Sequence, residues 1–298
     1  MSCFHAASNA ISRRLSPLLI APLVAWALAL PVAAQDRNAL QSQYTALTSR
    51  LADNPFQRPL VLDSAEKPDR LSGDIYAVVD HPFADIGALA KPANWCEVLM
   101  LHLNTKHCVV KGEGDGALLD VAVGRKFDQP LDKAQRVQFA WKPVASGADY
   151  LAVQLSADEG PLSTRDYRIV FEAAPIASGK SFVHLSYSYA YGTAARLAMK
   201  AYLGTLGSGK VGFTVTGRDA QGAPQQIGGV RGVVERNTMR YYLAIDAFLD
   251  APQPAQVDRR LAAWFDGTER YALQLHEVER ADYLAMKRSE YKRLKGGS

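Results

Sequence analysis

Residues 72–80 have the sequence SGDIYAVVD, and this segment decides how the chain around it is interpreted. Apolar side chains alternate on both of its faces, which predicts a β-strand that is buried on both sides. The alternating residues are Ile75, Ala77 and Val79 on one face and Tyr76 and Val78 on the other. His81 and Pro82 end the segment, because the residue before a proline and the proline itself interrupt regular structure.

Further strands are predicted between residues 106 and 191, where five or six runs alternate apolar and polar side chains. GEGDG at residues 112–116 predicts the tip of a hairpin. The apolar positions are Leu119, Val121, Val123, Val137, Phe139, Trp141, Leu151, Val153, Leu155, Tyr167, Ile169, Phe171, Val183, Leu185, Tyr187, Tyr189 and Tyr191. One apolar and one polar face in each run is typical of an antiparallel sheet that is solvated on one side.

Helices are predicted on either side of these strands. Residues 83–89 and 94–103 have the patterns of two short helices, and residues 230–249 have that of one long amphipathic helix. The predicted fold class is therefore α+β, with a curved antiparallel sheet wrapped around the long helix. That geometry tends to leave a cavity between sheet and helix, which favours binding of an apolar ligand over chemistry.

The flanking segments predict additional elements. These are a helix over residues 35–55, an extended linker over 56–70, a short helix over 193–206, a possible strand over 210–216, a loop over 218–229 and one C-terminal helix over 257–295. The predicted organisation is a signal peptide at 1–34, an N-terminal helix and linker at 35–69, the sheet-and-helix domain at 70–251 and a helical extension at 252–298.

The N-terminus has the features of a secretory signal peptide. Arg13 and Arg14 precede an apolar stretch over residues 15–30, and small residues end at Ala34, where a signal peptidase would cut. Two prolines make the stretch a poor membrane span, so we expect cleavage after Ala34 and a periplasmic or secreted location. The arginine pair leaves twin-arginine export open beside the general secretory route.

Net charge and hydropathy bear on whether the mature chain binds nucleic acid or spans a membrane. The expected mature chain has 264 residues (298 minus 34) and a formal charge of +2, which is +4 less the two arginines. Such a balance, without a dense basic run, leads us to expect no nucleic-acid partner. No second apolar run of membrane length follows residue 34, so we expect no integral membrane segment after cleavage. A protein partner stays open.

Two cysteines remain in the expected mature chain, Cys96 and Cys108. An even pair in an exported protein predicts a disulfide, which would tie the second short helix to the first long strand. A zinc site built with His102 and His107 is the alternative. It is disfavoured because His107 and Cys108 would point to opposite faces of a strand. We therefore expect no metal site.

The order of strand, two small helices, six antiparallel strands and long helix resembles the START-like (SRPBCC) superfamily of helix-grip proteins, which includes lipid-transfer domains and polyketide cyclases. The similarity covers about residues 70–250. It is carried by residues 73–79, Trp95, residues 161–171 (PLSTRDYRIVF) and residues 181–191. It departs at residues 194–229, where extra elements precede the final helix. The resemblance implies a lipid or other hydrophobic small molecule as ligand and no cofactor.

A set of side chains is expected to line the cavity of such a fold. It consists of Trp95, Phe139, Val153, Arg165, Tyr167, Ile169, Phe171, Leu185, Tyr187, Tyr189, Met239, Tyr242 and Ile245. For some residues two roles stay open. Arg165 and Asp166 either meet a polar ligand head or form a structural ion pair. Four polar residues of the long helix either line the cavity mouth or form a solvated face. They are Glu235, Arg236, Asn237 and Arg240. Tyrosines 187, 189, 191, 241 and 242 are either core or cavity lining.

Motifs suggestive of catalysis are incomplete. GTLGSGK at residues 204–210 fits a phosphate loop, but Val211 stands where a magnesium-binding hydroxyl residue is required, and the flanking elements are in the wrong order. His184 beside Ser186 or Ser188 is a possible general base, although a strand histidine is more often a bystander. We therefore expect a non-catalytic, exported binding protein or carrier. The alternatives are an interaction module with a filled core, or a cyclase- or hydrolase-like enzyme using Arg165, His184 and Glu235.

Overall fold

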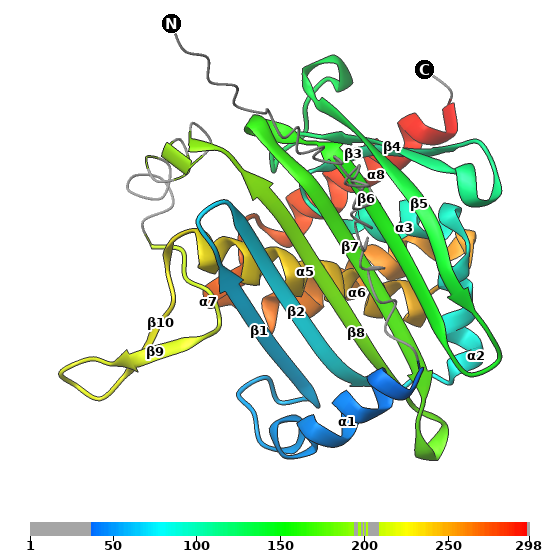
Figure 1. The fold of residues 1–298 in the computed structure, drawn as a ribbon. Helices are drawn as coiled ribbons and strands as arrows, with labels where there is room; N and C mark the ends of the chain where they lie inside the picture. The colour runs from blue at the N-terminus through cyan, green and yellow to red at the C-terminus, as the bar shows by residue number, and fades with distance from the viewer. Residues whose placement is uncertain (1–36, 194–195, 198, 200, 202–208, 297–298) are drawn as a thin grey trace, which may run out of the picture. The chain divides into compact units, whose positions relative to one another are not determined.

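The computed structural model describes residues 37–193, 196–197, 199, 201 and 209–296. Its main feature is an eight-stranded antiparallel sheet with the strand order β1-β2-β8-β7-β6-β5-β4-β3 (Figure 1). The strands are β1 (Leu60–Glu66), β2 (Arg70–Val79), β3 (Thr105–Lys111), β4 (Leu118–Val123), β5 (Gln135–Ser146), β6 (Leu151–Glu159), β7 (Thr164–Pro175) and β8 (Ser181–Tyr191). The predicted strand at residues 72–80 and the six that follow it are confirmed.

The edge strand β1 corrects the prediction of an extended linker over residues 56–70. Its residues pair with β2 along their whole length, from Leu60 opposite Ala77 to Glu66 opposite Leu71. Leu60 and Leu62 are buried on one face of the sheet and Val61 on the other. The segment contains Pro59 and Pro68 and was interpreted as an extended linker, whereas the alternation of these three residues is that of a strand.

A helix packs on each face of the sheet, and the shorter of the two lies at one end of the strands (Figure 1). The long helix α5 (Gly229–Asp250) packs on one face, and α1 (Arg37–Ala52) packs on the other through Leu40, Leu47 and Leu51. Gly73 on β2 permits a close approach of α5, because a Cβ atom at this position would lie 2.3 Å from Thr238 Oγ1. The element order and the sheet around α5 are those of the predicted α+β helix-grip arrangement.

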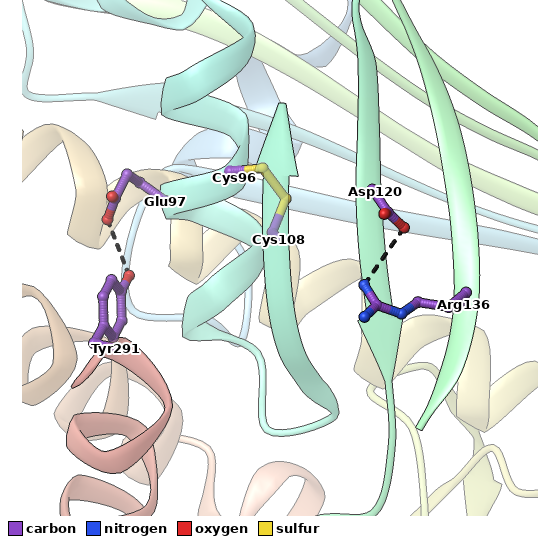
Figure 2. The surroundings of a disulfide bond; sticks show 6 residues. All are labelled: Cys96, Glu97, Cys108, Asp120, Arg136 and Tyr291. Carbon is purple, nitrogen blue, oxygen red and sulfur yellow. Dashed lines mark hydrogen bonds and ion pairs between the residues drawn. A yellow bond between two sulfur atoms is a disulfide. The ribbon is translucent and has the colours of Figure 1, made fainter. Parts of the chain in front are cut away.

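A disulfide ties the short helices to the sheet. Helix α2 (Phe83–Ile86) and a 3₁₀ turn, η1 (Gly87–Ala90), lead into α3 (Pro92–Leu101), and Cys96 on α3 is bonded to Cys108 on β3. Figure 2 shows this bond beside Glu97, which accepts a hydrogen bond of 3.0 Å from the hydroxyl of Tyr291. The predicted disulfide is confirmed. Among the described residues no group of three or more His, Cys, Asp and Glu side chains could hold a metal ion.

The C-terminal segment is three helices rather than the single helix predicted over residues 257–295. They are α6 (Val257–Glu269), α7 (Ala272–Leu275) and α8 (Arg280–Gly296). Helix α6 packs against α5, and α8 packs against α6 and β3. Of the 22 residues of α5, 15 are buried, so its polar residues do not form the solvated face that was one alternative. Within the described ranges, no helix is long and apolar enough to span a membrane.

The segment before α5 differs in part from the sequence expectation. Strand β9 (Val215–Arg218) overlaps the end of the possible strand predicted over residues 210–216. It pairs as a small hairpin with β10 (Pro224–Gln226), which lies within the loop predicted over residues 218–229. Asp219 shapes its tip, since Oδ1 accepts the backbone N–H groups of Gln221 and Ala223. Most of the predicted helix over residues 193–206, and residues 204–208 of the GTLGSGK motif, lie outside the described residues.

Candidate ligand cavity

Two adjoining hollows lie between the sheet and α5. We call the smaller one, of about 200 Å³, the aromatic cavity and the larger one, of about 390 Å³, the charged cavity. They share Asn104, Pro161, Tyr167, Tyr187 and Asn237 as lining residues. The aromatic cavity is also lined by Leu99, His102, Thr105, Val121, Val123, Val137, Phe139 and Tyr241. The charged cavity is also lined by Lys126, Leu162, Thr164, Tyr189, Met199, Val233, Arg236, Arg240 and Glu277.

A β-bulge in β7 positions Tyr167 in both cavities. The pairing of β7 with β8 shifts register between Arg165 and Arg168, and Asp166 within the shift has a φ of 53°. The hydroxyl of Thr164 donates to the carbonyl of Pro161, so it accepts from the hydroxyl of Tyr167 at 2.6 Å. Gly160 leaves room for the ring, because a Cβ atom there would lie 2.2 Å from it. Sequence alternation alone does not show this bulge.

Aromatic rings form a continuous lining beyond Tyr167. Tyr167 stacks on Tyr189 with centroids 5.2 Å apart, and Phe139 meets it edge-on at 6.2 Å. Tyr187 packs against Tyr241 at 5.3 Å. Burial raises the pKa values of Tyr167, Tyr187, Tyr189 and Tyr241, so all four phenols stay neutral at ordinary pH. The lining is therefore largely apolar, with neutral hydroxyl groups at its edges.

His102 contributes a neutral polar group to the aromatic cavity. Its ring stacks on Tyr241 at 5.2 Å, and its Nδ1 accepts the backbone N–H of Asn104 at 3.2 Å. The tautomer inferred from this bond carries its proton on Nε2, which has no hydrogen-bond partner in the part of the chain that the structure describes. Burial, followed by the charges of Arg240, Lys287 and Lys126, lowers the pKa of His102 well below its usual value.

A buried ion cluster borders the charged cavity. Glu277 pairs with Arg240 at 2.8 Å, with Lys126 at 2.7 Å and with Lys210 at 3.2 Å. Burial opposes ionisation of Glu277, but the cations outweigh it and lower its pKa to about 2. The side chains of Arg240 and Glu277 are 5% and 7% exposed, against 34% and 30% for the two lysines. The cluster therefore extends from the interior to the surface.

Only part of the predicted cavity set lines these hollows. The members of the set that line a cavity are Phe139, Tyr167, Tyr187 and Tyr189. The other apolar members are close-packed core and line neither cavity: Trp95, Val153, Ile169, Phe171, Leu185, Met239, Tyr242 and Ile245. The Trp95 ring meets Phe171 edge-on at 5.9 Å, and its Nε1 donates to Leu89 O at 2.8 Å. Side chains thus fill the sheet–helix interior next to α3.

The polar residues that the sequence analysis considered as cavity residues lie in different parts of the fold. Arg165 is exposed and pairs with Asp166 at 3.6 Å, which is the structural ion pair of the two alternatives. Arg236, Asn237 and Arg240 line the charged cavity, whereas Glu235 is fully buried and accepts the backbone N–H groups of residues 213 and 214. Tyr191 and Tyr242 line neither cavity.

His184 lies in a buried polar cluster among residues that face α1. Its Nδ1 lies 2.8 Å from Glu172 Oε2 and its Nε2 lies 3.1 Å from Asp74 Oδ1, while its ring stacks on Tyr76 at 4.3 Å. None of these residues lines the cavities. The trio of Arg165, His184 and Glu235 that the enzyme alternative requires therefore does not converge on one site.

Sequence reasoning missed Lys126, Glu277, Asn104 and His102 as cavity residues. Lys126 and Glu277 follow a strand and a helix that are far apart in the sequence, so no local spacing connects them. A lysine in a loop and a glutamate between two helices are ordinary surface residues in any pattern analysis. Only the packing of the C-terminal segment beside the sheet brings them together.

The chain matches no protein-family model and no curated protein sequence. Solved structures that resemble it include norcoclaurine synthase from Thalictrum flavum, at 15% identity and a TM-score of 0.33, covering 50% of this chain and 82% of that one. Ara h 8.0201 is similar at 14% identity and a TM-score of 0.32, covering 46% and 91%. A conserved protein of unknown function, EF2215 from Enterococcus faecalis, has 9% identity and a TM-score of 0.31, covering 88% and 98%. TM-scores this low support no inference about this chain, so the helix-grip assignment rests on the strand order of its own sheet.

Proposed function

We propose that this protein is exported to the periplasm and binds, without catalysis, a lipid or another hydrophobic small molecule between its sheet and α5. The observation that carries the proposal is the pair of adjoining cavities of about 200 and 390 Å³ with aromatic and aliphatic lining. Small-molecule sites are typically hollows of roughly 300–1,000 Å³ that are mostly apolar and contain a few placed polar groups. Asn104, Asn237 and His102 are such groups here.

The edge of the charged cavity supports an apolar ligand. Leu162 lines it and yet is 71% exposed, and Met199 and Val233 line it beside the tyrosines. Covering such surface is favourable because apolar atoms leave water. The size favours a molecule with one chain or a few rings over a two-chain lipid. Export is supported by the N-terminal sequence alone, from Arg13 to Ala34.

The test is organic extraction of native protein purified from a periplasmic extract, followed by mass spectrometry. We expect a co-purified apolar compound that is absent from a Val123→Phe variant, whose new ring would occupy the aromatic cavity. The matched control is Val153→Phe, because Val153 is fully buried in close-packed core, where overpacking destabilises by about 1–3 kcal/mol. The control should lower the melting temperature, whereas Val123→Phe should keep the fold and lose the compound.

Two results would contradict the proposal. The first is release of the same amount of compound by wild type and Val123→Phe. The second is protein that contains no compound and also fails to take up the neutral apolar dye N-phenyl-1-naphthylamine. Either result would favour the interaction-module alternative, with function carried by the surface.

A further inference from the structure

We propose that the free edge of β1 binds an extended segment of a partner polypeptide, which adds to the sheet as a further strand and presents an acidic side chain to Arg231. The site is a groove of about 420 Å³ that shares no described lining residue with the aromatic or the charged cavity. Its lining includes five consecutive residues of β1, Leu60–Ser64. Successive side chains of a strand point to opposite faces of the sheet, so all five residues border one groove only along the edge of the strand.

The register of β1 determines which of its backbone groups can pair with an added strand. The N–H of Val78 donates to the carbonyl of Pro59 at 3.0 Å, just before β1 begins. The N–H of Lys67 donates to the carbonyl of Arg70 at 2.8 Å, just after β1 ends. Both bonds join an odd-numbered residue of this segment to β2, and pairing alternates along an antiparallel strand that has no bulge. The N–H and C=O groups that point away from β2 are therefore those of Leu60, Leu62, Ser64 and Glu66.

The outward backbone groups of β1 have no hydrogen-bond partner within the part of the chain that the structure describes. β1 is the outermost strand of the sheet, and β2 is its neighbour on the other side. An unpaired edge of this kind is a template for another strand. A partner strand would satisfy the outward groups, and main-chain hydrogen bonds are the source of affinity when a peptide adds to a sheet edge.

Apolar side chains form part of the groove wall. Phe56 and Phe213 line it with ring centroids 5.7 Å apart, and Val215 lines it with 52% of its surface exposed. Leu62 belongs to the core between the sheet and α5, so its side chain points to the α5 face of the sheet. The residue of an added strand that lies opposite Leu62 would point to the same face. An apolar side chain at that position would leave water for this wall, which favours binding.

Arg231, in the first turn of α5, provides the charged part of the groove. Its Nε donates to Ser64 Oγ at 2.7 Å, and Ser64 Oγ donates to Glu235 Oε1 at 2.6 Å. Among the described residues no carboxylate forms an ion pair with Arg231, and its Nη groups have no hydrogen-bond partner. Arg50, the other arginine of the lining, is instead paired with Asp63 at 2.6 Å. A side-chain carboxylate on the residue opposite Ser64 would point to the same face as Arg231 and would accept charge-assisted hydrogen bonds from it.

The experiment begins with a selection of peptides. The residues opposite Leu62 and Ser64 are two positions apart in the added strand, so the partner segment should have an apolar and an acidic residue at that spacing. Short random peptides, displayed inside a loop of a carrier protein, are selected against the full mature chain, and we expect enriched sequences that contain this pair. Each enriched peptide is synthesised with an acetylated N-terminus and an amidated C-terminus, so that no terminal carboxylate contributes. Fluorescence anisotropy then gives its affinity.

Methylation of the amide nitrogens of the peptide tests strand addition directly and needs no variant of the protein. In an added strand, alternate N–H groups face β1 and the others face away from it. N-methylation at a position that faces β1 should abolish binding, because it removes a donor and places a methyl group against the edge. N-methylation at the intervening positions should leave the affinity unchanged.

Arg231→Gln tests the charged contact. It should weaken binding of the acidic peptide roughly fivefold, the value of a partly exposed ion pair. It should leave unchanged the affinity of a peptide in which glutamine replaces the acidic residue. Arg168→Gln is the matched control, because Arg168 is exposed on β7, which β2 and β8 separate from β1. Thermal melting verifies each fold, and if Arg231→Gln melts early, the wild-type protein should itself prefer the acidic peptide over the glutamine peptide by the same factor.

Three outcomes would overturn the proposal. Selection without any enriched peptide, or binding that N-methylation alters without a period of two residues, would exclude strand addition. A preference for the acidic peptide that survives Arg231→Gln, or no such preference in wild type, would exclude the contact with Arg231. A dimer that forms with rising protein concentration in sedimentation velocity, and that the selected peptides dissociate, would assign the edge to a second copy of this chain. The ligand proposed for the cavities is tested separately, since none of these measurements involves it.

Discussion

Glu290 on α8 holds two buried ammonium groups, and removal of its charge should be among the most destabilising single changes in this protein. The side chains of Glu290, Lys106 and Lys287 have no solvent exposure. Lys106 Nζ lies 3.0 Å from Glu290 Oε1, and Lys287 donates to Oε2. Lys287 also donates to the carbonyl of Thr105 at 2.7 Å, so the cluster fastens α8 to β3.

The magnitude follows from the geometry. At an effective dielectric constant of about 20, two unit charges about 3 Å apart attract by about 5–6 kcal/mol. Desolvation offsets much of that attraction, and breaking a buried pair by removing one partner destabilises by about 3–5 kcal/mol. Glu290→Gln keeps the volume and one acceptor oxygen, so we expect a loss of about 4 kcal/mol in the free energy of unfolding at pH 7. The triple variant with Lys106→Met and Lys287→Met should recover most of this loss, because no buried charge remains.

Urea unfolding followed by circular dichroism measures both variants, with unchanged m-values as the condition for comparing them. A loss below about 1 kcal/mol for Glu290→Gln, within the range of ordinary surface pairs, would refute the reasoning. So would a triple variant as unstable as the single one.

Lys287 adds a pH dependence to this cluster. Burial, opposed by Glu290, lowers its pKa to about 8 from 10.5. The unfolded chain therefore binds more protons than the folded chain between these values, and stability rises with pH there. This gain in the free energy of unfolding is complete above pH 10.5 and is lost as the pH falls through 8. Between pH 8 and about 9.5, before tyrosines in the unfolded chain ionise, Lys287→Met should flatten this rise.

Three further expectations concern other parts of the chain. Thiol titration of the denatured, unreduced protein should find no free thiol. Replacing Cys96 and Cys108 by serine should lower the free energy of unfolding by about 3 kcal/mol, whereas two titratable thiols would contradict the bridge. Burial opposes protonation of His184, but its hydrogen bonds to two carboxylates outweigh burial and raise its pKa. The stabilisation that the protonated His184 ring provides is therefore complete below pH 6.5 and is lost as the pH rises through the raised pKa. His184→Gln should lower the free energy of unfolding more at pH 6 than at pH 9. Equal losses at the two pH values would exclude a stabilising role of the protonated ring. N-terminal sequencing of periplasmic protein should begin at or near Gln35, and a full-length chain in the membrane fraction would contradict cleavage.

Period-two alternation was sufficient to predict most of the sheet. Strands such as β8 present apolar side chains at alternate positions, and the residue pattern alone determines which face each one occupies. The edge strand β1 escaped prediction because it lies between Pro59 and Pro68, and the two prolines dominated the interpretation of this segment. The disulfide was predictable because only two cysteines remain in the expected mature chain.

The candidate site was predictable only in its aromatic part. Phe139, Tyr167, Tyr187 and Tyr189 stand on the apolar face of the strands, and strand periodicity identifies them. Periodicity does not distinguish a side chain that fills space from one that borders a hollow, so Leu185 and Tyr187 appeared equivalent. That difference depends on the volumes of all neighbouring side chains. The ionic part depends on long-range packing, which no local pattern contains.

The location of Glu277 has a consequence for any attempt to shorten this protein. In the sequence, residues 252–298 look like an appendix to a complete helix-grip domain. In the fold, this stretch supplies the carboxylate that borders the charged cavity and two helices, α6 and α7, that contact α5. A fragment that ends at residue 251 would leave Arg240 and Lys126 without their common counterion. Ligand screening therefore requires a chain that retains residues 252–298, because Glu277 borders the charged cavity.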